Sequence, residues 1–364
     1  MRLRSSLALI VGGALLAIFG VQTALSDGWG DPVRVESIPG TSPEFNYEAL
    51  DGCPIEAPDG LSFYMASDRP GGQGGIDIWR ATRVSTDDPW GAPVNLGAPV
   101  NSSANDFCPT PVEDGRLFFV STRGGGCGAA DIYVAEPAGA GWSEPVNIGC
   151  QANSPGNEFS PSLIELGSND SVLFFSSDRP GGFAQESAGA VPDHDIYYSR
   201  VLPGGAYGPA ILVSGVNSAV DDARPNVRLD GLEMVFDSTR EGTLGGPDIW
   251  VASRATVHHA WPAPVHLPAP INSPAAESRA SLSSTGERLY FGSTRDGGDG
   301  GSDVYVSTVG GSAGESPAPI SPPNTGDGGL RGGTSWTQRA LIIVAGCFGF
   351  VLLLERLNAR VRGS

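Results

Sequence analysis

The chain has 364 residues, of which 52 are Gly and 30 are Pro and only 17% are charged, a composition that excludes a coiled coil and favours short strands joined by tight turns. All 22 basic residues are Arg, which excludes lysine-nucleophile and Schiff-base chemistry. Residues 27–330 hold 39 of the 40 acidic residues but only 15 Arg, so this segment has a net charge of −24 and is not expected to bind nucleic acid.

The first 26 residues have the features of a secretory signal peptide. Arg2 and Arg4 precede an apolar run from Leu7 to Val21, and Ala24 and Ser26 follow with the spacing of a cleavage site. An uncleaved membrane anchor is the alternative interpretation. Both interpretations predict that the residues that follow are exported.

One sequence motif occurs five times in the middle of the chain. It consists of an apolar strand, Ser-x-Arg, a Gly-rich loop, and Asp followed by an apolar and an aromatic residue. Its Arg residues are Arg69, Arg123, Arg179, Arg240 and Arg295, and its Asp residues are Asp77, Asp131, Asp195, Asp248 and Asp303. Each Arg can pair with the Asp across the turn, and the Asp can also accept hydrogen bonds from loop N–H groups. Because the residues recur in every copy, we interpret them as structural.

Two further sequence motifs lie between these copies. Trp-x-x-Pro-Val, with Tyr in place of Trp once, predicts a short outer strand. An Asn five residues before an acidic residue precedes each expected inner strand. The acidic residues are Asp51, Asp106, Glu158, Asp222 and Glu277. Each unit therefore has four short strands, which is typical of a β-propeller blade.

These strands predict an all-β fold, a five-bladed β-propeller of four-stranded antiparallel blades over residues 28–308. The repeat begins with a lone strand near residues 29–35 and ends with three strands near residues 281–308. One strand plus three make a fifth blade, so the two ends of the repeat are expected to close the ring.

The repeat resembles the TolB-like, WD-repeat-like β-propeller family. The matching signature is S-[DT]-R-x-G-G-x-G-G-x-D-I-[WY], followed by W-x-x-P-V-N-L-G and N-S, and it covers about residues 28–308. Familiar members have six blades and work in the bacterial envelope, where they contact lipoproteins or other envelope proteins. The resemblance implies a role in binding other envelope components.

The five acidic residues precede the innermost strands, so we expect them to ring one mouth of the central channel. Arg224 and Arg279 follow two of them at a spacing of two residues, and an insertion in the third hairpin ends at His194. Insertions often mark a binding face, so these residues form the predicted binding surface. In the alternative interpretation, the acidic residues accept backbone hydrogen bonds at the blade junctions.

Four of the five Cys lie in the exported part of the chain, an even number that permits two disulfides. Cys53 and Cys108 take equivalent positions in neighbouring blades, and Cys127 and Cys150 are expected on the same face of one blade. The sequence therefore predicts Cys53–Cys108 and Cys127–Cys150 bonds. No Cys or His spacing indicates a metal site, and no cofactor is expected.

Residues 309–335 are rich in Gly, Ser and Pro and are predicted to form a flexible stalk. The apolar segment 336–357 and the basic tail 358–364 predict a transmembrane segment with a cytoplasmic end. A stretch of the stalk resembles a sortase sorting signal, with Pro322 in place of the usual Leu. Its residues are Pro323, Asn324, Thr325 and Gly326. Covalent attachment to the cell surface through Thr325 and simple membrane anchoring both remain open.

We expect a monomeric, exported propeller that binds an envelope or extracellular protein, or a glycan, without catalysis. The alternative is a propeller-type glycoside hydrolase or lyase that acts on polysaccharide, because two carboxylates suffice for that chemistry. The acidic residues recur in every blade, whereas an active site needs unequal partners. The four His residues form no triad with a nucleophile. The sequence therefore predicts no enzyme.

Overall fold

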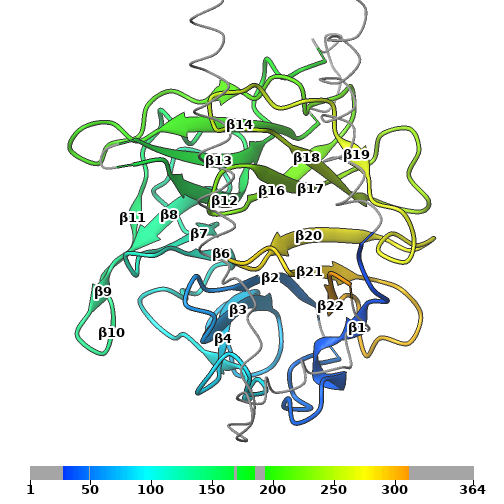
Figure 1. The fold of residues 1–364 in the computed structure, drawn as a ribbon. Helices are drawn as coiled ribbons and strands as arrows, with labels where there is room; N and C mark the ends of the chain where they lie inside the picture. Colours follow the sequence, from blue (N-terminus) through cyan, green and yellow to red (C-terminus); the bar gives the residue numbers. More distant parts are fainter. Residues whose placement is uncertain (1–27, 49, 168–169, 185–192, 311–364) are drawn as a thin grey trace, which may run out of the picture. The chain divides into compact units, whose positions relative to one another are not determined.

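A computed structural model describes residues 28–48, 50–167, 170–184 and 193–310. Their strands form five four-stranded antiparallel sheets arranged around a centre, which confirms the predicted five-bladed β-propeller (Figure 1). The signal peptide, most of the stalk with its sorting motif, the apolar segment and the basic tail lie outside the described residues. Within the described ranges, no helix is long and apolar enough to cross a membrane.

Each blade runs from an inner strand beside the channel to a short outer strand. Blade 1 consists of β2 (Asp51–Glu56), β3 (Ser62–Ser67), β4 (Asp77–Thr82) and β5 (Val94–Asn95). Blade 2 consists of β6 (Asp106–Pro111), β7 (Leu117–Ser121), β8 (Asp131–Ala135) and β11 (Val146–Asn147), with an added hairpin of β9 (Pro137–Ala138) and β10 (Gly141–Trp142). Blade 3 consists of β12 (Glu158–Glu165), β13 (Ser171–Ser177), β14 (Asp195–Arg200) and β15 (Ile211–Leu212). Blade 4 consists of β16 (Asp222–Val227), β17 (Glu233–Ser238), β18 (Asp248–Ser253) and β19 (Val265–His266).

The fifth blade joins the two ends of the repeat. It consists of β20 (Glu277–Leu282), β21 (Arg288–Ser293), β22 (Asp303–Thr308) and β1 (Val33–Arg34). β1 pairs antiparallel with β22, with Val33 opposite Val306 and Arg34 opposite Tyr305. The predicted closure by one strand plus three is therefore confirmed, and it joins the start of the repeat to its last blade.

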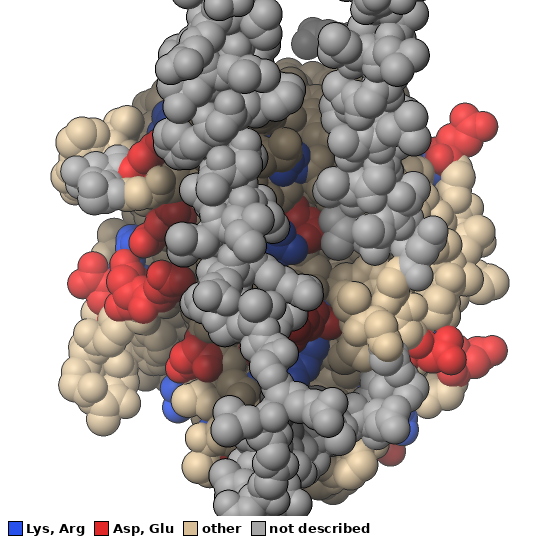
Figure 2. Space-filling model, in the orientation of Figure 1, with Lys and Arg blue, Asp and Glu red and all other residues tan. Residues whose placement is uncertain are grey.

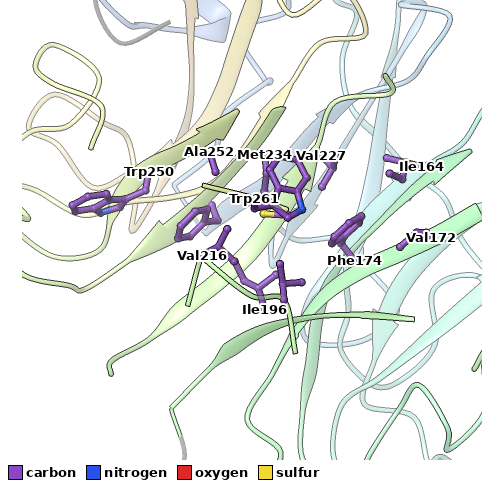
Figure 3. Packing of buried hydrophobic residues seen from close by; sticks show 12 residues of the cluster. Ile164, Val172, Phe174, Ile196, Val216, Val227, Met234, Trp250, Ala252 and Trp261 are labelled. Carbon is purple, nitrogen blue, oxygen red and sulfur yellow. The ribbon is translucent and has the colours of Figure 1, made fainter. Parts of the chain in front are cut away.

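The hydrophobic core consists of layers between neighbouring blades. Between blades 3 and 4, Phe174, Met234 and Trp261 are buried in one cluster, and Figure 3 shows their side chains between the two sheets. Comparable clusters lie at the other four junctions. Burial of apolar side chains on both faces of each sheet explains why the strands are apolar on consecutive residues and do not alternate strictly.

The Asn of each repeat joins one blade to the blade before it. Oδ1 of Asn153 accepts the Ile132 N–H at 2.9 Å, and its Nδ2 donates to the Ile132 carbonyl at 3.1 Å. The same two-bond arrangement occurs at Asn46, Asn101, Asn217 and Asn272. All five Asn residues are buried, so these bonds satisfy backbone groups that water does not reach.

Candidate functional site

The five acidic residues at the starts of the inner strands are buried inside the blade junctions. In blade 2, the side chain of Asp106 is 0% exposed, and its Oδ2 accepts the Ser102 N–H at 2.7 Å. Asp51, Glu158, Asp222 and Glu277 are equally buried and bound in the same way. The structure therefore places these carboxylates within the junctions and away from the surface of the mouth. This agrees with the alternative in which the acidic residues accept backbone hydrogen bonds at the blade junctions.

Each of these carboxylates also binds the Arg of its own blade. The N···O distance is 2.6 Å between Arg69 and Asp51 and 2.7 Å between Arg123 and Asp106. The remaining pairs are Arg179 with Glu158, Arg240 with Asp222, and Arg295 with Glu277. The predicted pairing of each Arg with the Asp across its hairpin is therefore wrong, because the guanidinium turns toward the inner strand and binds the buried carboxylate there.

The hairpin Asp residues bind their own Gly-rich loops instead. In blade 2, Asp131 accepts the Cys127 N–H at 2.5 Å and the Gly128 N–H at 3.2 Å. Asp77, Asp195, Asp248 and Asp303 accept loop N–H groups in the same way. These bonds hold the loops on the face of the propeller where the channel mouth lies.

The channel is lined by five residues that share an unusual backbone conformation. Each lies two positions after a buried acid, at a bulge in its inner strand, with φ between 48° and 57°. They are Cys53, Cys108, Ser160, Arg224 and Arg279. A non-glycine residue rarely adopts this conformation. Its recurrence in every blade shows that the bulge belongs to the architecture, while the side chain that it presents differs between blades.

Both predicted disulfides are confirmed. Cys53 and Cys108 join the inner strands of blades 1 and 2, with their Cα atoms 4.8 Å apart. Cys127 and Cys150 join the hairpin loop of blade 2 to the residues after its outer strand, with their Cα atoms 5.5 Å apart. The first bond lies in the channel wall, so it fixes two blades beside the mouth.

A cavity of about 330 Å³ occupies the mouth, and its walls differ in chemistry. Phe107 and Phe159, from blades 2 and 3, lie on one side with their ring centroids 5.8 Å apart. Arg224 and Arg279, from blades 4 and 5, line the same cavity. Pockets of this volume, with apolar walls and a few charged groups, are typical of small-ligand sites.

Asp237 lies between the two Arg residues of the mouth. Its Oδ2 accepts from Nη1 of Arg224 at 2.5 Å, and its Oδ1 accepts the backbone N–H of Arg279 at 2.9 Å. Burial lowers the pKa of Arg279 to about 10, and the charge of Arg224 adds to this effect. The mouth therefore carries two cationic side chains in a strongly acidic chain. Figure 2 shows the acidic excess as red side chains along both sides of the molecule.

A second group of titratable residues lies beside Phe159, where blades 3 and 4 meet. The His194 ring lies 5.2 Å from the Phe159 ring, and its Nδ1 is 3.0 Å from Oδ1 of Asp221. Asp221 holds the position in blade 4 that Asn105 and Asn157 hold in blades 2 and 3, where those two Asn residues line the cavity. Sequence reasoning found His194 through the insertion but missed Asp221, since that position varies between the repeats.

The two carboxyl groups beside His194 have pKa values that move in opposite directions. Burial raises the pKa of Asp193, and the negative charge of Asp221 raises it further. Burial alone would raise the pKa of Asp221 as well, but hydrogen bonds from the backbone and ring of His194 lower it. Two carboxyl groups whose pKa values are shifted in opposite directions therefore flank His194, which is the unequal pair that the repeated acids do not provide.

Solved structures with the same fold are carbohydrate-active enzymes. A family-43 glycoside hydrolase (GH43_12) from a capybara gut metagenome matches with a TM-score of 0.50 and 15% identity, over 76% of this chain and 55% of that one. A xylan β-1,4-xylosidase from Bacillus halodurans matches with a TM-score of 0.51 and 13% identity, over 75% and 57%. This chain thus spans little more than half the length of these two structures. No family model and no curated protein matches the sequence.

These comparisons correct the resemblance drawn from the repeat. The structures that match are five-bladed propellers of glycoside hydrolases and not members of the TolB-like, WD-repeat-like family. The expectation of a non-catalytic partner-binding protein was based on that resemblance and on the recurrence of an acidic residue at the same position in all five blades. The comparisons contradict it, because the solved structures that share the fold are glycoside hydrolases.

Within the ranges that the structure describes, no three His, Cys, Asp or Glu side chains gather closely enough to hold a metal ion.

Proposed function

We propose that the propeller is a glycan-cleaving enzyme whose reaction takes place at the channel mouth, beside Phe159. The observation that carries the proposal is the pair Asp193 and Asp221 at the blade junction beside Phe159, where Asp221 is bound by His194 and Asp193 precedes His194 in the chain. The hydrolase fold of the solved structures supports it as an analogy.

The two carboxyl groups fit the two tasks of glycoside hydrolysis. Asp193, with its raised pKa, donates its proton to the leaving glycosidic oxygen as the bond to the anomeric carbon breaks. Asp221 remains ionised and accepts a proton from the water whose oxygen forms the new bond to that carbon. The His194 ring and backbone N–H hold Asp221 in place and favour its charged form. The products are a new reducing end and a free hydroxyl group.

The aromatic wall fits the other requirement of such a site. Phe107 and Phe159 offer adjacent ring faces to the cavity, and the apolar C–H face of a sugar ring packs against such surfaces. A cavity of about 330 Å³ admits a short stretch of glycan and not a folded protein.

The test is release of new reducing ends from a panel of plant and bacterial polysaccharides by the full-length protein. We expect Asp193→Asn and Asp221→Asn each to reduce kcat by about 100-fold or more without loss of folding. Asp170→Asn is the matched control, because Asp170 forms an exposed ion pair with Arg200 at the far end of blade 3. Full activity in both site variants would exclude these residues as the catalytic pair.

We also propose that the propeller lies outside the cytoplasmic membrane. Two disulfides support an oxidising compartment, because such bonds are rare where thiols are kept reduced. The signal-peptide pattern at residues 1–26 and the positive charge that follows the apolar segment support the same orientation.

A further inference from the structure

The five-fold repeat of the propeller breaks at the positions that face the mouth. One residue after the buried acid, the blades carry Gly52, Phe107, Phe159, Ala223 and Ser278 in order. One residue later they carry Cys53, Cys108, Ser160, Arg224 and Arg279. The surrounding architecture is the same in every blade, so the fold itself does not require this division into an aromatic side and a cationic side.

We propose that Arg224 and Arg279 bind the carboxylate of an acidic sugar, so that the glycan taken by this propeller contains uronic acid residues. The proposal rests on the proposed function for the glycan itself and adds its chemical class. Its basis is the cationic side of a cavity whose other side is aromatic.

The two guanidinium groups differ in the carboxylates beside them, because the charge of Arg224 acts on both Asp237 and Asp221. Asp237 forms an ion pair with Arg224, and its second oxygen is taken by the backbone N–H of Arg279. The Arg279 guanidinium forms no ion pair or hydrogen bond with any described residue. A carboxylate is therefore the group that the Arg279 guanidinium lacks, and an Arg fork suits a carboxylate because it can donate two parallel hydrogen bonds.

The chain also makes room for this guanidinium. A Cβ atom at Gly52 would lie 3.0 Å from Nη1 of Arg279 and 3.4 Å from its Cδ. Equivalent positions in blades 2 and 3 hold the large side chains of Phe107 and Phe159. Gly52 of blade 1 therefore leaves space for the Arg279 side chain to pass. The guanidinium can then remain at the cavity.

Burial and charge in the mouth favour an anionic ligand. The lowered pKa of Arg279, about 10, means that its charge is poorly compensated where it stands. A bound carboxylate would offset that cost, whereas a neutral sugar would leave it unchanged. A uronic acid residue offers both an apolar ring face for Phe107 and Phe159 and a carboxylate for the Arg pair, so it matches both walls of the cavity.

The test is calorimetric binding of defined trisaccharides to the full-length protein. The probes are trigalacturonate and trimannuronate, with the methyl ester of each trimer and neutral xylotriose as controls. We expect at least one acidic trimer to bind, its methyl ester to bind at least 10-fold more weakly, and the affinity to fall as salt is added. No binding of either acidic trimer, or equal binding of acid and ester, would overturn the proposal.

Variants locate the binding. Arg279→Gln and Arg224→Gln are each expected to weaken binding of the acidic trimer by about 10- to 100-fold. Gly52→Val should weaken it as well, because it displaces the guanidinium while Arg279 remains in the chain. Arg200→Gln is the control, since that Arg is 58% exposed at the far end of blade 3. Unchanged affinity in folded Arg279→Gln and Gly52→Val proteins would overturn the assignment.

The outcomes separate this inference from the proposed function. If the acidic trimer binds in an Arg-dependent manner but is never cleaved, the catalytic proposal fails and the ligand class stands. If neutral glycans are cleaved and the Arg variants cleave them equally well, the catalytic proposal stands and the ligand class is wrong.

Discussion

Nη2 of Arg123, just after β7, lies 2.7 Å from Oδ1 of Asp106 at the start of β6. The carboxylate is fully buried, and the same Arg atom donates to the Val100 carbonyl at 2.5 Å. One guanidinium therefore joins the inner strand of a blade to the segment that enters it. Because the arrangement recurs in all five blades, it contributes to the stability of the entire ring.

Replacement of this Arg should destabilise the fold. Arg123→Ala leaves a buried carboxylate without its cation, which typically costs about 3–5 kcal/mol. The free energy of unfolding, measured by urea denaturation, should fall by that amount, and Arg240→Ala should behave similarly. Arg200→Ala, at an exposed pair, should change it by less than about 1 kcal/mol. Equal urea midpoints for wild type and Arg123→Ala would show that the pair contributes nothing.

The Gly residues of one hairpin loop should differ in their tolerance of substitution. A Cβ at Gly126 would lie 1.7 Å from Oδ2 of Asp131, whereas a Cβ at Gly124 meets nothing within 4 Å. Gly126→Ala should therefore lower the free energy of unfolding by about 1–3 kcal/mol, and Gly124→Ala should leave it nearly unchanged. Thermal unfolding of the two variants tests this, and equal melting temperatures would contradict it.

The Cys53–Cys108 bond should stabilise the junction of blades 1 and 2. Replacement of both residues by Ser is expected to lower the free energy of unfolding by about 2–5 kcal/mol, because the bond closes a long loop of the unfolded chain. Thiol alkylation followed by intact mass measurement supplies the control. Reduction of the unfolded wild type should expose four additional thiols, and no gain would show that neither bond forms.

The pH dependence of cleavage should follow the two carboxyl groups beside His194. Activity should be lost as pH rises through the raised pKa of Asp193, since the general acid then loses its proton. It should be lost at the acidic end as pH falls through the lowered pKa of Asp221.

The His194→Phe variant distinguishes the two limbs of the pH profile. It removes the ring hydrogen bond to Asp221, so the pKa of that carboxyl should rise and the acidic limb should move to higher pH. The alkaline limb should change less, because it reports on Asp193. An acidic limb that stays in place would show that it does not arise from Asp221.

Processing of the termini can be read from the intact mass of the protein recovered from cells. We expect residues 1–26 to be absent, as in an exported protein. A chain that ends at Thr325 would indicate covalent surface attachment, and a chain that retains 358–364 would indicate a membrane anchor. Retention of the signal segment would contradict cleavage and leave the N-terminal anchor interpretation.

The sequence by itself determined the repeat, the number of blades, the closure of the ring and the pairing of the Cys residues. These features depend on short stretches of sequence. An apolar run, a Gly-rich turn and a second strand specify a hairpin wherever they occur, and the number of copies gives the number of blades. Equivalent positions in neighbouring repeats lie side by side in a propeller, which is why the sequence pairs Cys53 with Cys108, whose Cα atoms are 4.8 Å apart.

Only the tertiary structure decided what the polar residues do. Whether Arg69 binds Asp77 or Asp51 depends on which way its side chain turns at the end of β3, and strand spacing does not determine that. The bulge in each inner strand brings Phe107, Arg224 and Arg279 to one cavity although long stretches of chain separate them. The residues that repeat in the sequence build the ring. The candidate site consists of residues that differ between the repeats, and only the folded ring shows which of these residues lie close together.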